Sequence, residues 1–226
     1  MTNKSENLKV SALYHHPEHS IAYPLLARFE YPWDALASIA DFIKETGKTL
    51  SEDIYDKYGE DVWIAKTAKV APTAFICGPA IICDEAEIRH CAFIRGSAIV
   101  GAGAVVGNST ELKNCILFDG VQVPHYNYVG DSILGYKSHM GAGSVTSNVK
   151  SDKTPVTVTL EDERIETGRR KFGAMLGDFV EVGCNSVLNP GTVVGCNTNI
   201  YPLSSVRGYV PENCIYKARN NVVVKH

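Results

Sequence analysis

Residues 64–118 read IAKTAK VAPTAF ICGPAI ICDEAE IRHCAF IRGSAI VGAGAV VGNSTE LKNCIL F, so the chain repeats itself every six residues. Each unit opens with an apolar side chain, and alanine stands two positions before seven of these residues, at 68, 74, 80, 86, 92, 98 and 104. An α-helix needs an apolar period near 3.6 and a strand a period of about 2, so neither explains this pattern. It predicts an all-β solenoid, a parallel β-helix whose short strands meet at corners with the aliphatic side chains inside.

The sixfold spacing is lost after Phe118 and returns in a second run, at Leu176, Val182, Leu188, Val194, Ile200 and Val206. Residues 149–175 between the runs follow no sixfold rule. Within them, two alternating segments flank the polar residues 161–164, which predicts a projecting β-hairpin. Long loops on a rigid scaffold often carry function, so this insertion is a candidate functional element.

The 226 residues divide into a head, 1–62, a solenoid, 63–210, with the hairpin insertion at 149–175, and a tail, 211–226. The head holds 11 acids and 6 bases, whereas the remainder carries a small positive charge. Helical spacing after Pro32 predicts a helix that stops near Gly47, with a second short helix from Ser51. We expect this head to be a helical cap over the open end of the solenoid.

Composition excludes several classes of protein. With 22 Lys and Arg against 25 Asp and Glu, we expect no binding to nucleic acid or to an anionic membrane. The polar N-terminus lacks a signal-peptide pattern, so we expect a cytoplasmic protein. Seven cysteines without a C-x-x-C pair indicate reduced, apolar thiols. We interpret His15, His16 and His19 as surface residues rather than a metal site.

His125 stands out among the seven histidines. It lies where the sixfold spacing fails, in PHYNYVGD at 124–131, and GAGSVTSN follows at 141–148. An imidazole accepts a proton near neutral pH, so a histidine in an irregular, glycine-rich region is a candidate general base.

At these residues the chain resembles a known family. The motifs VGN at 106–108, PHYNYVGD, GAGS at 141–144 and Asn148 are similar to those in the acetyltransferase half of bifunctional glucosamine-1-phosphate acetyltransferases/uridyltransferases. The segment TGRRKFGAMLG at 167–177 resembles the archaeal sugar-1-phosphate nucleotidylyltransferase/acetyltransferases. This resemblance implies a left-handed β-helix, a homotrimer, acetyl-CoA as co-substrate and an amino sugar 1-phosphate as acceptor. Nothing resembles the nucleotide loop of the other half, so we expect no nucleotidyl transfer.

The resemblance also implies roles for single residues. His125 matches the general base, and Ala142 matches the residue whose backbone N–H faces the oxyanion and the coenzyme. Cys184 and Pro202 fall on further coenzyme positions. The remaining matches are acceptor-binding positions, with cations for the sugar phosphate among them: Arg95, Lys113, Tyr128, His139, Asn148 and Lys153.

Three of these positions depart from the family pattern. His139 replaces an asparagine that touches the acceptor, which leaves the identity of the sugar open. Pro202 has no N–H to donate to the coenzyme, and the Cys184 thiol donates weakly.

Two other functions stay open at this point. The protein could be a zinc carbonic anhydrase on the same solenoid, but His90, His125 and His139 lack that family's spacing, so we expect no metal site. It could also be a non-catalytic scaffold or a regulatory protein that binds sugar nucleotides. The departures at His139 and Pro202 favour this alternative, as does Val149, which replaces a tyrosine of the bacterial enzyme.

Overall fold

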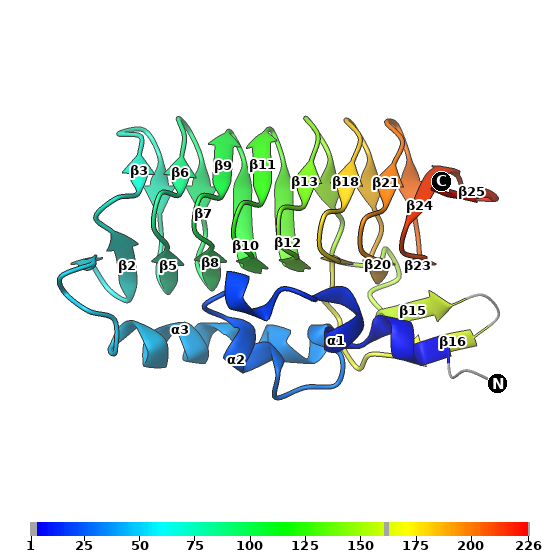
Figure 1. The fold of residues 1–226 in the computed structure, drawn as a ribbon, viewed down its shortest axis with the longest axis horizontal. Coiled ribbons are helices and arrows are strands. Elements are labelled where there is room, and N and C mark those ends of the chain that lie inside the picture. Colours follow the sequence, from blue (N-terminus) through cyan, green and yellow to red (C-terminus); the bar gives the residue numbers. More distant parts are fainter. Residues whose placement is uncertain (1–3, 161–162, 226) are drawn as a thin grey trace.

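The computed structural model describes residues 4–160 and 163–225 and confirms the solenoid. The chain folds as a left-handed parallel β-helix with three faces, and the head and the hairpin lie outside it (Figure 1). The first face stacks β2 (Val62–Ala65), β5 (Ala80–Ile82), β8 (Ala98–Val100), the second halves of β10 (Glu111–Leu117) and β12 (Tyr128–Leu134), β17 (Ala174–Leu176), β20 (Thr192–Val194) and β23 (Tyr209–Val210).

The other two faces are assembled in the same way. The second face stacks β4 (Phe75–Ile76), β7 (Phe93–Ile94), the first halves of β10 and β12, β14 (Val145–Thr146), β19 (Val187–Leu188) and β22 (Ser205–Val206). The third face stacks β3 (Lys69–Val70), β6 (Glu87–Ile88), β9 (Val105–Asn108), β11 (Gln122–His125), β13 (His139–Met140), β18 (Glu181–Val182), β21 (Asn199–Ile200) and β24 (Cys214–Ala218).

The sixfold rule describes the interior of this prism. The aliphatic side chains that open the repeats point inward, and Ile82, Ile94 and Val106 are fully buried. The alanines at 80, 86, 92, 98 and 104 are also buried, as expected for small residues in tight sites. Burying such side chains contributes about 25 cal/mol per Å² of apolar area. This row of buried aliphatic side chains is therefore a main source of the solenoid's stability.

The row of inward-facing apolar side chains does not end after Phe118, contrary to the interpretation of the sequence. It continues from Leu112 through Leu117, Val123, Val129, Leu134 and Met140, all buried, with two steps of five residues in place of six. The shortened steps coincide with β10 and β12, which run through a corner and pair on two faces. The irregularity is therefore a local change of corner and not an end of the solenoid.

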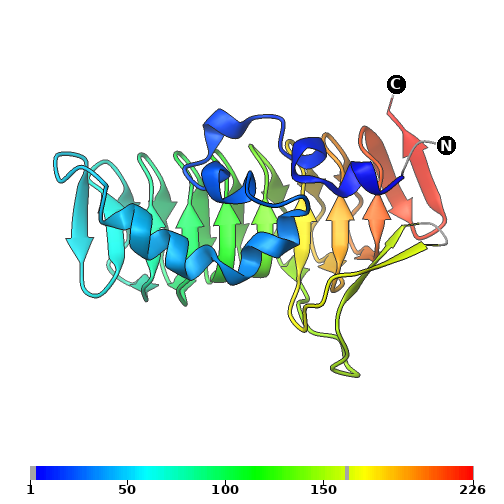
Figure 2. The same ribbon diagram turned by 90° about the horizontal axis from the view of Figure 1, so that it is seen from below.

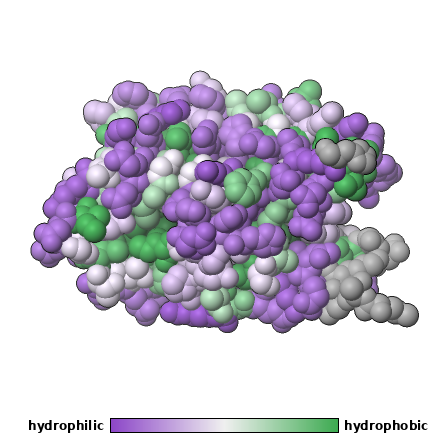
Figure 3. Space-filling view, in the orientation of Figure 1, coloured by the Kyte–Doolittle hydropathy of each residue, from purple (hydrophilic) through white to green (hydrophobic). Residues whose placement is uncertain are grey.

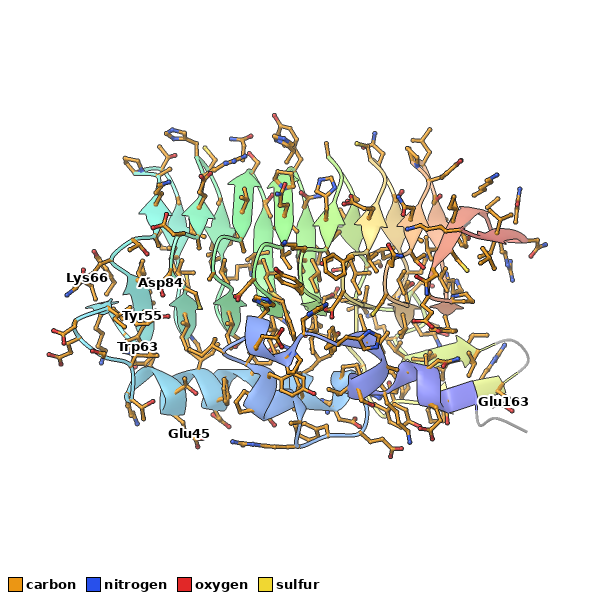
Figure 4. The ribbon with its side chains drawn as sticks, viewed as in Figure 1. Glu45, Tyr55, Trp63, Lys66, Asp84 and Glu163 are labelled. Carbon is orange, nitrogen blue, oxygen red and sulfur yellow. The ribbon has the colours of Figure 1, made fainter. Side chains whose placement is uncertain are left out.

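The head lies along the first face and not over the open end, so its expected position is wrong (Figures 1 and 2). Helix α3 (Ile39–Gly47) packs on β5, β8 and β10, and the 3₁₀ helix at Pro32–Ala37 packs on β12. The helix ends at Gly47 as predicted, and a Cβ there would meet the Trp63 ring at 2.4 Å. Figure 4 shows Trp63 on the first coil, close to this end of α3.

The head begins with short helices: α1 (Val10–Leu13), α2 (Tyr23–Leu26), and 3₁₀ turns at Lys4–Leu8 and Pro17–His19. Two of the three clustered histidines anchor this segment instead of decorating the surface. The His19 ring stacks on Tyr136 at 3.9 Å, and His16 packs against the same ring. The buried Asp178 carboxylate accepts hydrogen bonds from the backbone N–H groups of His15 and His16.

The two ends of the solenoid differ. At the first coil, the predicted helix from Ser51 is absent from the described residues. Instead β1 (Tyr55–Tyr58) pairs antiparallel with β2. A cavity of about 960 Å³ and exposed apolar residues such as Phe75 remain at this end, where Figure 3 shows apolar surface. At the other end, the predicted tail continues the solenoid, because β24 pairs parallel with β21 and β25 (Asn221–Val224) folds back on it.

The predicted hairpin is present as β15 (Thr157–Leu160) and β16 (Glu163–Glu166), which pair antiparallel and project from the prism (Figure 2). Residues 161 and 162 of the predicted turn lie outside the described residues. In the described part of the chain, no helix is long and apolar enough to cross a membrane.

Candidate functional site

Four of the predicted site residues stack at one corner of the prism, at the end of the third face. We call the stack of His90, Asn108, His125, Ala142, Cys184 and Pro202 the corner column. Backbone hydrogen bonds join its successive coils: Gly143 N–H donates to the His125 carbonyl at 3.0 Å, Asn185 N–H to Ala142 at 2.8 Å and Leu203 N–H to Cys184 at 2.9 Å. The solenoid thus brings together residues that lie far apart in the sequence.

His125 is exposed on this column, at the end of β11. Its ring has no hydrogen-bond partner among the described residues, so both ring nitrogens are open to a ligand. The buried Asn127 fixes the backbone beneath it. The Asn127 side chain accepts from His125 N–H at 3.1 Å and donates to the Gly141 and Ser144 carbonyls at 2.9 and 3.0 Å. This clamp holds His125 against the turn that contains Ala142.

The column also presents free backbone donors. The N–H groups of Ala142 and Cys184 make no hydrogen bond within the described chain, although both residues lie between bonded neighbours. Such fixed N–H groups can stabilise a developing oxyanion or bind a carbonyl. Pro202, on the next coil, breaks the series because it has no N–H. The column could hold an extended ligand with amide groups along the coils.

A second group of predicted residues lies on the second face. We call Lys113, Asn114, Tyr128, Asp131 and Asn148 the Asp131 cluster. The Asp131 side chain is buried and accepts hydrogen bonds from Lys113 Nζ at 3.2 Å, Asn114 Nδ2 at 2.8 Å and Asn148 Nδ2 at 2.5 Å. Asn148 Nδ2 also lies 3.2 Å from the Tyr128 hydroxyl. The five side chains therefore form one connected polar network.

The backbone explains why Asp131 stands at this place. Its φ of 48° lies in the left-handed region, which aspartate tolerates better than most residues. Burial raises the pKa of the Tyr128 phenol, so this hydroxyl stays protonated near neutral pH.

Arg95 lies at the rim of the cluster. Its guanidinium donates to the Glu111 carboxylate at 2.6 Å, and both side chains are partly exposed. The position of Arg95 on the coil before Lys113 leaves two cations side by side on this face. Both have a carboxylate partner already, so an incoming anion would have to share them.

His139 and Lys153 lie apart from both groups. His139 is on the outer surface of the third face, and its Nδ1 is 2.8 Å from the Glu181 carboxylate. Lys153 is exposed in the turn before the hairpin, and its side chain forms no hydrogen bond or ion pair with any described residue.

Asn114 was not singled out from the sequence, and neither were two buried residues that organise the site, Asn127 and Asp131. Both lie inside the 124–131 motif, and both are buried polar side chains with several partners. A polar residue at a corner position of the repeat indicates a structural hydrogen-bonding role, because the backbone needs side-chain partners at corners.

The described residues contain no group of three or more His, Cys, Asp or Glu side chains that could hold a metal ion. His90 instead hydrogen bonds to Thr73 at 2.9 Å, and His139 to Glu181.

Comparison with known proteins gives a consistent set of similarities. A family model described as the GMPPB C-terminal domain matches residues 76–194. The bifunctional sugar-1-phosphate nucleotidylyltransferase/acetyltransferase of Sulfurisphaera tokodaii is 38% identical over 94 residues, which cover 42% of this chain and 23% of that protein. The bifunctional protein GlmU of Methanocaldococcus jannaschii is 39% identical over 90 residues, 40% of this chain and 22% of that protein. The chain therefore spans less than a quarter of the length of these curated relatives.

Solved structures align with lower similarity. The acetyltransferase domain of PglB from Neisseria gonorrhoeae, in complex with acetyl coenzyme A, aligns over 80% of this chain and 63% of its own, with a TM-score of 0.34 and 16% identity. PerB from Caulobacter crescentus, in complex with CoA and GDP-perosamine, aligns over 73% of this chain and 57% of its own, with a TM-score of 0.26 and 17% identity.

Proposed function

Because the chain belongs to the GMPPB C-terminal domain family, whose match covers residues 76–194, we propose that it is an acyltransferase built on the left-handed β-helix. It moves an acetyl group from acetyl-CoA to the amine of an amino sugar 1-phosphate. The Sulfurisphaera tokodaii relative, which has acetyltransferase in its name, supports this proposal. The observation that carries it is the juxtaposition of the His125 ring and the Ala142 N–H on the next coil, neither of which has a hydrogen-bond partner among the described residues.

The reaction follows from these two groups. The amine of the sugar is mostly protonated at neutral pH, so a base has to remove a proton before nitrogen can attack. That first proton passes to solvent, and His125 takes a second proton from the nitrogen as it forms a bond to the thioester carbonyl carbon. The negative charge on the carbonyl oxygen is stabilised by the Ala142 N–H. When the C–S bond breaks, the proton on His125 passes to the leaving thiolate, which gives the amide and CoA.

The Asp131 cluster is the proposed acceptor site. Arg95 and Lys113 supply positive charge to the sugar phosphate, and Tyr128 and Asn148 supply hydrogen bonds to the sugar. The family resemblance adds Lys153 to the proposed phosphate contacts and His139 to the residues that select the sugar. Coenzyme lies along the corner column, past Ala142, Cys184 and Pro202.

The site is proposed to lie between copies of the chain in a homotrimer. Within one chain, His139 is on the third face and the Asp131 cluster is on the second. A neighbouring chain that packs one face against the other would bring these groups to a common cleft. Light scattering should then give three times the mass of one chain, and a monomer would contradict this arrangement.

The experiment that tests the function is CoA release with a small panel of acceptors. We expect release with glucosamine 1-phosphate, little with glucosamine, which lacks the phosphate, and none with glucose 1-phosphate, which lacks the amine. Thermal unfolding with acetyl-CoA should show stabilisation, because a ligand that binds the folded state raises its stability. Absence of both stabilisation and release would contradict the proposal and favour the non-catalytic scaffold that Pro202 suggests.

A further inference from the structure

A basic pocket lies between the head, the solenoid and the segment that returns from the hairpin. It has a volume of about 460 Å³, and its polar wall is formed by Asn114, Asp131, Arg169, Arg170 and Lys171. Asn114 and Asp131 also belong to the Asp131 cluster, so the pocket shares a wall with the proposed acceptor site. None of the roles proposed above uses the three consecutive cations at 169–171.

Backbone hydrogen bonds hold these cations in place. Val156 N–H donates to the Arg169 carbonyl at 2.7 Å, on the hairpin side. Phe172 N–H donates to the Asn148 carbonyl at 3.0 Å and Gly173 N–H to the Asp131 carbonyl at 2.8 Å, on the solenoid side. Backbone hydrogen bonds therefore fix the segment at both ends. At the solenoid end, they join it to two members of the Asp131 cluster.

The head fixes the first of the cations. Arg169 Nη2 donates to the Asp34 carbonyl at 2.7 Å. The Nε–H group of the same side chain is buried and has no acceptor among the described residues. A buried N–H without a partner costs about 1–3 kcal/mol, so an acceptor at this position would remove a penalty.

The other two cations are unpaired. Arg170 and Lys171 are exposed, and within residues 4–160 and 163–225 neither side chain forms a hydrogen bond or an ion pair. Glu163, the acidic residue of β16 nearest the hairpin turn, lies toward the outer end of the hairpin (Figure 4). The pocket's one carboxylate, Asp131, already has Lys113, Asn114 and Asn148 as partners. The pocket thus carries an excess of positive charge.

The cations of the pocket differ from Arg95 and Lys113 in their carboxylate partners, and this difference indicates the class of ligand that the pocket binds. Those two cations each have a carboxylate partner, whereas Arg170 and Lys171 have none in the described chain. Two free cations with a buried guanidinium N–H offer both charge and directed donors, which is the combination that phosphate oxygens require. A carboxylate ligand would use fewer of these donors.

We propose that the basic pocket binds a phosphoryl group, held by Arg170 and Lys171, with Arg169 Nε–H as a further donor. The phosphoryl group could come from the acceptor, as the outer phosphate of an amino sugar carried on a nucleoside diphosphate, and this source rests on the proposed function. It could also come from a separate phosphate-bearing ligand. The chemistry recognised is the same in both cases.

Calorimetric titration of the full chain with pyrophosphate tests the site itself. We expect binding that weakens as salt is added. The double variant Arg170→Gln/Lys171→Gln should bind at least about tenfold more weakly, because two charge-assisted contacts are lost. Arg164→Gln is the matched control, since Arg164 is an exposed arginine of β16 outside the pocket, and it should bind as the wild type does.

Three results would overturn the proposal: no binding by the wild type, unchanged binding by the double variant, or an equal loss in Arg164→Gln. Because Arg170 and Lys171 are exposed, the double variant should keep the wild-type unfolding temperature, which shows that a loss of binding is not a loss of folding. The titration contains no acetyl-CoA, so its outcome is independent of whether the chain transfers acetyl groups.

Steady-state kinetics distinguish the two sources of the phosphoryl group. If it belongs to the acceptor, the double variant raises KM for a nucleoside-diphosphate-linked amino sugar by about tenfold and leaves KM for the 1-phosphate unchanged. If it belongs to a separate ligand, pyrophosphate binding falls and both KM values stay the same.

Discussion

At the corner column, the His125 ring has no hydrogen-bond partner in the described chain, whereas the Asp131 carboxylate, on the second face, accepts hydrogen bonds from three side chains. Backbone hydrogen bonds join the coils of the column, so its geometry does not depend on the side chains of His125, Ala142, Cys184 and Pro202. The Asp131 cluster is held by its side chains. Substitutions in the column should therefore change chemistry alone, and substitutions in the cluster should change chemistry and stability together.

The largest effect is expected at His125. Replacement by alanine should lower the rate of acetyl transfer by about 10²-fold or more, since it removes the proposed base. The free energy of unfolding should not change, because the ring contacts no described partner. His90→Ala is the matched control, since His90 stands in the same column two coils away. Full activity in His125→Ala, or equal losses in both variants, would remove His125 from the reaction.

Asp131 should give the largest loss of stability. Asp131→Ala leaves Lys113, Asn114 and Asn148 without their shared acceptor, which should cost about 1–3 kcal/mol in urea unfolding. Activity should fall as well, because Lys113 and Asn148 lose their positions. Asp131→Asn keeps the shape and the tolerance for positive φ, so it should lose less stability than alanine. A stable, active Asp131→Ala would show that the cluster does not organise the site.

Arg95 should give a smaller and purely functional effect, although it neighbours the cluster. Its ion pair with Glu111 is partly exposed, and exposed pairs contribute about 0–1 kcal/mol to stability. Arg95→Gln should raise KM for the sugar phosphate by about tenfold, because it removes one proposed phosphate contact. KM for acetyl-CoA should stay the same. A rise in the KM of acetyl-CoA instead would place Arg95 on the coenzyme side.

The smallest effect is expected at Pro202, where alanine restores a backbone N–H to the corner column. KM for acetyl-CoA should fall by about threefold, which corresponds to less than 1 kcal/mol. Pro211→Ala controls for the general effect of removing an exposed proline, which acts through the unfolded chain. A fall in KM in both variants, or in neither, would separate Pro202 from the coenzyme.

Much of the solenoid was predictable from the sequence, because every coil has to bury one residue at each corner-to-corner step. The sixfold repeat therefore predicted directly that Ile82, Ile94 and the alanines at 80, 86, 92, 98 and 104 are buried. His125 was a candidate from its own surroundings, whereas Ala142, Cys184 and Pro202 were singled out only through the family resemblance. A period alone does not say which of many equivalent corners carries the chemistry.

The position of the head could not be predicted from its own residues, but the solenoid contains a signal for it. In six strands of the first face, the middle residue points outward and is nevertheless apolar and buried: Ile81, Ile99, Ile116, Ile133, Met175 and Val193. Strands that are covered on both sides read as continuous apolar runs. These continuously apolar three-residue strands therefore mark the face that α3 and its neighbours cover.

The partners of the polar residues were also beyond the sequence pattern. His139 pairs with Glu181 across the whole insertion, and Asn148 pairs with Asp131 across a separation of 17 residues. The two five-residue steps at β10 and β12 shift the coil register in this region, and a sixfold count cannot anticipate which side chains they bring together.

The most direct test of the account is a crystal structure of the wild-type chain with CoA. We predict that the pantetheine arm lies along the corner column, past the N–H groups of Ala142 and Cys184. The CoA sulfur should lie within about 4 Å of the His125 ring of one chain, which is the separation that reacting groups need. CoA bound on another face, or in the cavity at the first coil, would contradict the assignment of the column as the catalytic site.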